Sequence, residues 1–148
     1  MRPIENTLPR FEIKSVQSDF PSVRISNTST AADFIRQFYG DDIFIFESSF
    51  ILLLNNSNNT IGFAKISQGG ITGTVVDARL VAHYAVNSLA TSVILAHNHP
   101  SGNLNPSESD RQLTNKIKEG LKLLDISLLD HIILTGASYT SFADSGLL

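Results

Sequence analysis

The sequence predicts an α/β domain in which helices cover a mixed central sheet. Two observations predict this fold class. Apolar runs of strand length alternate with segments whose apolar residues recur at helical spacing. The chain has 148 residues, 42% hydrophobic and 17% charged, which is enough to bury a core. No repeat or long linker divides it, so we expect an arm over residues 1–27 and one domain over 28–148.

The arm and the first helix come first along the chain. FEIKSVQ, at residues 11–17, alternates apolar and polar side chains, which predicts a short strand within the arm. AADFIRQFYG, at residues 31–40, has apolar residues at helical spacing. Thr30 and Asp33 can form a capping box at the start of this helix, and Gly40 can end it.

A β-hairpin and a second helix are expected next. IFIFESSFILLLNN (43–56) and NTIGFAKIS (59–67) are rich in Ile, Phe and Leu, and the asparagines between them favour a turn. GGITGTVVD (69–77) reads as an extended piece that its glycines interrupt. ARLVAHYAVNSLA (78–90) predicts a helix. The residues expected on its apolar face are Leu80, Val81, Ala85 and Leu89.

The last third of the chain predicts a strand, a helix and two further strands. SVILAH (92–97) is a continuous apolar run, typical of a central strand that is covered on both faces. A third helix is expected over 106–124, and DHIILTG (130–136) and SYTSF (138–142) predict the closing strands. The residues expected on the inner face of the third helix are Leu113, Ile117, Leu121 and Leu124.

Composition excludes several classes of function. There is no cysteine, so a metal site must use His, Asp or Glu, and a thiol nucleophile is ruled out. The net charge of −3 disfavours DNA as a partner. No apolar run reaches the roughly 20 residues that cross a bilayer, and no signal peptide opens the chain, so we expect no membrane association and a cytoplasmic location.

The segment HNHPSGNLNPSESD, from His97 to Asp110, carries the clearest chemical pattern. Side chains two residues apart in a strand share a face, so His97 and His99 can bind one metal ion. Asp110 is the candidate third ligand. Each feature also has an ordinary explanation, because the histidines could be a hydrogen-bonded pair and Ser107 with Asp110 could be a capping box.

Together these residues resemble a known motif. His97-x-His99, seven residues, Ser107, two residues and Asp110 are similar to the motif of the JAB/MPN (JAMM) zinc metallopeptidases. VILAHNHPSGNLNPSESD followed by LLDHIIL resembles the RadC family within that superfamily, over residues 31–148. The resemblance implies a mixed sheet between helices, related to the cytidine deaminase architecture. It also implies that His97, His99 and Asp110 bind Zn²⁺, with Ser107 beside the metal.

Glu47 completes the set that the resemblance implies, since the family has a glutamate just ahead of an apolar strand. Independently of the family, Glu47 is unusual as a carboxylate between two apolar runs, where burial is costly unless the group is paired or functional. The alternative is a solvent-facing turn over residues 47–49. His131, in LLDHIIL, is expected to be a core residue or to lie next to the ligands.

The resemblance implies amide or isopeptide hydrolysis of a peptide or protein substrate by zinc-activated water. Glu47 would act as general base and then general acid, and Ser107 would donate to the oxyanion. Two alternatives stay open, a DNA repair-associated RadC-like role and a catalytically silent MPN scaffold. The full-length RadC pattern has a helix-hairpin-helix DNA-binding segment before the domain, and we expect this protein to be a short form without it. A strand in the arm could pair across a homodimer.

Overall fold

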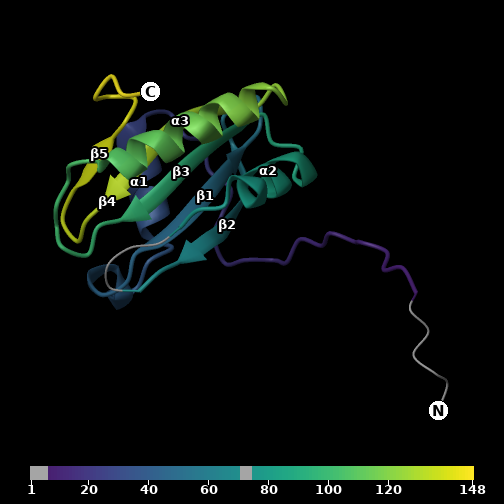
Figure 1. Ribbon diagram of the computed structural model, residues 1–148, viewed down its shortest axis with the longest axis horizontal. Helices are drawn as coiled ribbons and strands as arrows, with labels where there is room; N and C mark the ends of the chain where they lie inside the picture. The colour runs from purple at the N-terminus through teal and green to yellow at the C-terminus, as the bar shows by residue number, and fades with distance from the viewer. Residues whose placement is uncertain (1–6, 71–74) are drawn as a thin grey trace, which may run out of the picture.

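The computed structural model describes residues 7–70 and 75–148. Five strands form one sheet in the order β2-β1-β3-β4-β5, with β3 and β4 parallel and the other neighbours antiparallel (Figure 1). The elements are α1 (Thr28–Arg36), the 3₁₀ helix η1 (Asp41–Phe44), β1 (Ser48–Leu54), β2 (Thr60–Gln68), α2 (Ala78–Asn87), β3 (Ser92–Asn98), α3 (Glu108–Lys122), β4 (Ser127–Leu134) and β5 (Tyr139–Ser141). The predicted α/β class with a mixed sheet is confirmed.

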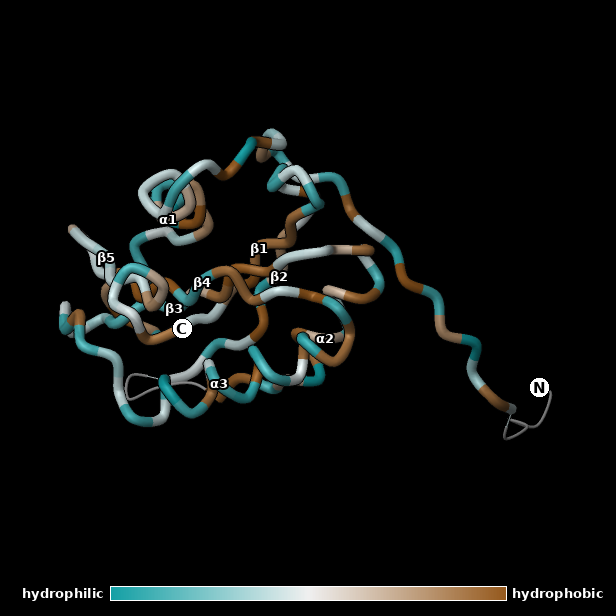
Figure 2. Tube along the Cα trace, turned by 90° about the horizontal axis from the view of Figure 1, so that it is seen from above, coloured by the Kyte–Doolittle hydropathy of each residue, from teal (hydrophilic) through white to brown (hydrophobic). Residues whose placement is uncertain are grey.

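Helices cover both faces of the sheet, α1 on one side and α2 with α3 on the other (Figure 2). Successive strand residues point to opposite faces, so each inner strand supplies both cores. Leu52 and Ile94 pack in the core on the α1 side, whereas Leu53 and Leu95 pack in the core beneath α2 and α3. β1 and β3 are buried along their whole length, as the continuous apolar run of β3 predicts.

A β-bulge in β4 determines which of its side chains face α3. Val93 pairs with Leu128, but the next residue, Ile94, pairs with Asp130, so one residue of β4 is skipped. Leu128 lies in the core beneath α3, and the bulge reverses the alternation after it, so that Ile132 lies on the α1 side. His131 therefore faces α3 together with its strand partner Leu95.

The arm differs from its prediction. No strand forms over 11–17, where the described chain has no regular structure and most apolar side chains are exposed, Phe11 at 89%. The arm meets the sheet through an isolated bridge between Arg24 and Asn59, and the ring of Phe20 packs on Phe63 with centroids 5.3 Å apart. The alternating pattern alone was insufficient, since a strand also needs a partner edge.

The predicted position at which the hairpin begins is also wrong. Residues 41–44 form η1, and the strand begins only at Ser48. Ile43 is buried in the α1-side core, whereas Phe44 is 63% exposed and its ring lies against Gly136, where a β-carbon would be 2.2 Å from it. Packing and side-chain hydrogen bonds from another strand, described below, override the β-propensity of this run.

Smaller corrections concern the helices. α1 begins at Thr28, because Asn27 rather than Thr30 is its N-cap, and it ends at Arg36 rather than Gly40. In α2 only Val81 and Ala85 of the four predicted inner residues are buried. The predicted extended piece at 69–77 includes residues 71–74, outside the described residues. Within the described ranges, no helix has the length and apolarity needed to span a bilayer.

Candidate metal centre

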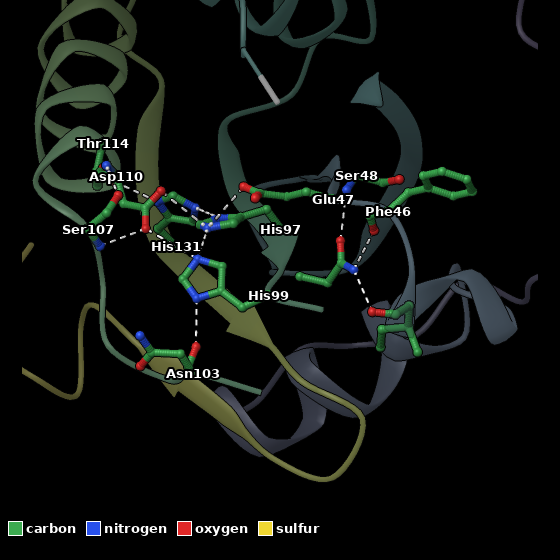
Figure 3. A network of polar contacts seen from close by, with 12 residues as sticks. Phe46, Glu47, Ser48, His97, His99, Asn103, Ser107, Asp110, Thr114 and His131 are labelled. Atoms are coloured by element: carbon green, nitrogen blue, oxygen red, sulfur yellow. Dashed lines mark hydrogen bonds and ion pairs between the residues drawn. The ribbon is translucent and has the colours of Figure 1, made fainter. Parts of the chain in front are cut away.

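Four side chains of metal-ligand type meet where β1, β3 and α3 come together (Figure 3). His97 lies near the end of β3 and His99 just beyond it, while Asp110 is in the first turn of α3. Ser49 of β1 pairs with His97 in antiparallel register, and continuing that register by two residues brings Glu47 opposite His99. One ligand atom from each of the four lies within 4.8 Å of the others.

The distances between these atoms fit a small metal ion. His97 Nε2 and His99 Nε2 are 2.9 Å apart, and the Asp110 carboxylate oxygens lie 3.3 Å from His97 Nε2 and 3.4 Å from His99 Nε2. A tetrahedral zinc site with bonds of about 2.0–2.2 Å spaces its ligand atoms about 3.3–3.6 Å apart. Glu47 Oε1 is farther away, at 3.9 Å from His97 Nε2. The donor set and the two spacings to Asp110 therefore fit zinc, while the two histidine nitrogens lie closer together than the ligand atoms of a tetrahedral zinc site.

The capping box and the candidate ligand coexist at Asp110. The Ser107 hydroxyl accepts a hydrogen bond from the Asp110 backbone N–H at 3.0 Å, and the Asp110 carboxylate accepts one from the Ser107 N–H at 2.8 Å. The cap thus orients the carboxylate that faces the histidines. The two interpretations drawn from the sequence are not exclusive, because the cap uses the backbone N–H of Ser107 and leaves the carboxylate facing both rings.

The charges of the cluster support one another. Burial by itself raises the pKa of Asp110, but the adjacent imidazoles of His97 and His99 outweigh it and hold that pKa well below its usual range. The hydrogen bond to Asp110 raises the pKa of His99, against the opposing effect of burial. Asp110 is therefore an anion beside two imidazoles, an arrangement that favours a cation between them.

His99 has a well-defined tautomer. Its Nδ1 lies 2.6 Å from the backbone carbonyl oxygen of Asn103, in the loop between β3 and α3. A carbonyl oxygen only accepts, so Nδ1 carries a proton and Nε2 is the nitrogen directed at the other ligands. This arrangement, with the second ring nitrogen donating to an acceptor, is usual for metal-binding histidines.

Buried side chains on the interior side of His97 hold its ring in place. Its Nδ1 is 2.7 Å from Nε2 of His131, and Nδ1 of His131 is 2.5 Å from the Thr114 hydroxyl. His131 is fully buried, stacks on Phe142 with ring centroids 4.7 Å apart, and burial lowers its pKa well below the usual value. Its ring is therefore neutral and lies directly behind a candidate ligand, one of the two positions expected from the sequence.

Asn98 fixes the segment that carries Glu47. Its buried amide accepts a hydrogen bond from the Ser48 N–H at 2.8 Å and donates to the carbonyls of Ile43 and Phe46 at 2.8 and 2.7 Å. These bonds hold residues 43–48 against the end of β3. Glu47 is half-buried rather than in a solvent-facing turn, and burial raises its pKa although His97 and His99 oppose the effect.

Ser107 is the predicted site residue with the weakest connection to the cluster. Its side chain is exposed, and its hydroxyl oxygen is the acceptor in the cap of α3, which leaves the hydroxyl proton available to another acceptor. Sequence reasoning missed Thr114 altogether. Thr114 lies four residues after Asp110, one helical turn along the same face of α3, and that spacing was the available signal.

Comparisons with known proteins show the family to which this sequence is similar. The profile of a family described as RadC-like JAB domain matches residues 25–147. A UPF0758 protein from Flavobacterium johnsoniae is 52% identical over 101 residues, which cover 68% of this chain and 44% of that protein. Another, from Porphyromonas gingivalis, is 48% identical over 103 residues, 69% of this chain and 45% of that protein.

A more distant relative matches a longer part of the chain. UPF0758 protein NMC1174 from Neisseria meningitidis is 36% identical over 127 residues, 86% of this chain and 56% of that protein. The chain thus spans about half the length of the curated relatives it matches.

Proposed function

This chain belongs to the RadC family of JAB domains, and from that premise we propose that it is a zinc-dependent hydrolase of amide or isopeptide bonds. The observation that carries the proposal is the convergence of Glu47 with three ligand-type side chains, His97, His99 and Asp110, around one point. A domain that served only as a scaffold would not need a carboxylate of raised pKa beside such a set.

His97 and His99 would hold the ion through Nε2, and Asp110 through its carboxylate. When bound, zinc supplies a Lewis acid and lowers the pKa of a coordinated water toward about 7. The protein's contribution is to fix three donors, with the capping box aligning Asp110 and the Asn103 carbonyl aligning His99. Glu47 stays outside the ligand spacing, at 3.9 Å from His97 Nε2.

Glu47 would serve as the proton carrier of the reaction. Burial shifts the pKa of this carboxylate upward, toward neutral pH. A group whose pKa lies near the working pH can both accept a proton from the attacking water and return it to the leaving amine. The Asn98 amide holds the backbone on either side of Glu47 and so positions it without entering the reaction. The free hydroxyl proton of Ser107 would donate to the oxyanion of the tetrahedral intermediate.

We propose a peptide or protein as the substrate and the cytoplasm as the place of action. The net charge of −3 makes a nucleic acid the less favourable partner, since phosphate contacts need clustered Lys and Arg. The glutamate and the free hydroxyl suit bond cleavage through a protonated leaving group, which amide hydrolysis requires.

Comparison with Glu47→Gln tests the proposal, because this variant keeps the size of the side chain and removes its proton-accepting carboxylate. Zinc-loaded wild type and variant would be incubated with a proteome-derived peptide mixture, and new amino termini identified by mass spectrometry. We expect cleavage by the wild type, a loss of at least about 100-fold in the variant, and equal zinc content in both. Cleavage that is equal in both proteins, or absent from both, would contradict the proposed role.

A further inference from the structure

A buried chain of three side chains runs from the candidate metal centre into the protein interior. His97 contacts His131 of β4, and His131 contacts Thr114 of α3, whose hydroxyl also lies 2.6 Å from the backbone carbonyl oxygen of Asp110 (Figure 3). The exposed fractions of His97, His131 and Thr114 are 3%, 0% and 2%. Water cannot replace any of these contacts without opening the core, so the donors and acceptors must match among themselves.

The directions of the two inner hydrogen bonds of this chain follow from its last member. The Asp110 carbonyl oxygen only accepts, so the Thr114 hydroxyl must donate its single proton there. The hydroxyl oxygen then accepts from His131, which places the proton of that ring on Nδ1. The opposite direction would press two acceptor oxygens together at 2.6 Å.

The same reasoning continues to His97. Among the residues that the structure describes, the His131 ring has only His97 and Thr114 as hydrogen-bond partners, and a charged imidazole without a carboxylate would be costly at full burial. The ring is therefore neutral with a bare Nε2, which accepts from His97 Nδ1 at 2.7 Å. His97 then carries its proton on Nδ1, and the lone pair of its Nε2 faces His99 Nε2 and the Asp110 carboxylate, where a bound cation would bridge the three acceptor atoms.

We propose that Thr114 and His131 are positioning residues that set the tautomer of His97 and thereby make its Nε2 available to a metal ion. Their importance lies in the fact that the hydrogen bonds of this chain could also run in the opposite direction. Without the hydroxyl, His131 has no acceptor for its Nδ1 proton, and the proton is better placed on Nε2, where it donates to His97. That change moves the proton of His97 to Nε2, directly into the space between the ligands.

The arrangement also explains why the bulge of β4 matters to the site. Without the skipped residue before Asp130, the alternation of β4 would turn the side chain of His131 to the α1 face, away from His97. Phe142 then secures the ring, since its own N–H donates to the His131 carbonyl at 3.0 Å and its ring stacks on the imidazole. The stacking contact favours the observed orientation of the His131 ring.

The test compares Thr114→Val with Thr114→Ser. Valine keeps the branched shape of threonine and removes the hydroxyl, whereas serine keeps the hydroxyl. Zinc dissociation constants would be measured by competition with a chelator on the whole chain, with urea unfolding to verify the fold. We expect a 10- to 100-fold weaker affinity in Thr114→Val, the range typical of lost contacts to a ligand histidine, and an affinity close to wild type in Thr114→Ser. Equal affinities in all three proteins would overturn the proposal.

A second readout needs no metal. Long-range ¹H–¹⁵N correlation spectra of the metal-free protein at alkaline pH distinguish protonated from bare ring nitrogens. We expect His97 to carry its proton on Nδ1 in the wild type and on Nε2 in Thr114→Val; a wild-type proton on Nε2 would overturn the proposal. The inference rests on the proposed zinc site, but the two fail separately. Absence of zinc binding in the wild type would contradict the proposed function, while the spectra would still decide the tautomer.

Discussion

The His97-Asn98 pair and the His99–Asn103 pair supply neighbouring ligand positions by opposite means. His97 and Asn98 lie in the buried strand β3, and Nδ1 of His97 and the amide of Asn98 are satisfied by residues 34 to 55 positions away in the sequence. His99 lies in the loop beyond the strand and is tied to a backbone carbonyl only four residues away. The strand pair depends on the whole fold, whereas the loop pair depends on the local course of the chain.

The largest effect on stability is expected at Asn98. Asn98→Ala removes three hydrogen bonds to the backbone of residues 43–48, so we expect a loss of about 2–4 kcal/mol in the free energy of unfolding. Peptide cleavage should fall with it, because Glu47 lies within the released segment. Urea unfolding of the metal-free protein measures the first effect. A loss under about 1 kcal/mol would show that the amide does not hold this segment.

The two histidines give an intermediate contrast. Both alanine variants should lose zinc, but only His97→Ala leaves the buried Nε2 of His131 without a partner, at a cost of about 1–3 kcal/mol in the metal-free protein. His99→Ala removes a bond to an exposed loop and should change stability by about 0.5 kcal/mol or less. Unfolding curves measured without metal distinguish the two variants. Equal losses of stability in both would contradict the distinction between the two pairs.

The smallest effect is expected at Asn103. The contact to His99 uses the backbone carbonyl, and the Asn103 side chain accepts one exposed hydrogen bond from the Asn105 N–H. Asn103→Ala should therefore change stability by no more than about 0.5 kcal/mol and leave zinc affinity at the wild-type value. Chelator competition would reveal any larger role, and a tenfold weaker affinity would mean that the side chain shapes the loop.

Much of the site could be predicted from sequence because its signals are local. The spacing of His97 and His99 at a strand end and the capping pattern at Asp110 both act over a few residues. The alternation that assigns residues of β1 and β3 to opposite faces is equally local. The same alternation turns Asn98 away from the two histidines, to the face where its amide holds residues 43–48.

The features that sequence reasoning missed depend on contacts between distant segments. The apolar run 43–46 has the composition of a strand. The Asn98 amide nevertheless donates hydrogen bonds to two of its backbone carbonyls and holds it outside the sheet. The bulge in β4 has no marker such as glycine, and it alone turns His131 toward His97. Thr114 is inconspicuous within its helix, since its role exists only once His131 faces it.

The central claim is that Asp110, His97 and His99 together bind zinc, and elemental analysis of purified, tag-free protein tests it most directly. Wild type would be compared with Asp110→Ala and with Ser107→Ala, which loses the hydroxyl of the same helix cap and keeps all three ligands. We expect about one zinc per chain in the wild type and in Ser107→Ala, and none in Asp110→Ala. Absence of zinc from the wild type after zinc is added back, or its retention in Asp110→Ala, would contradict the account.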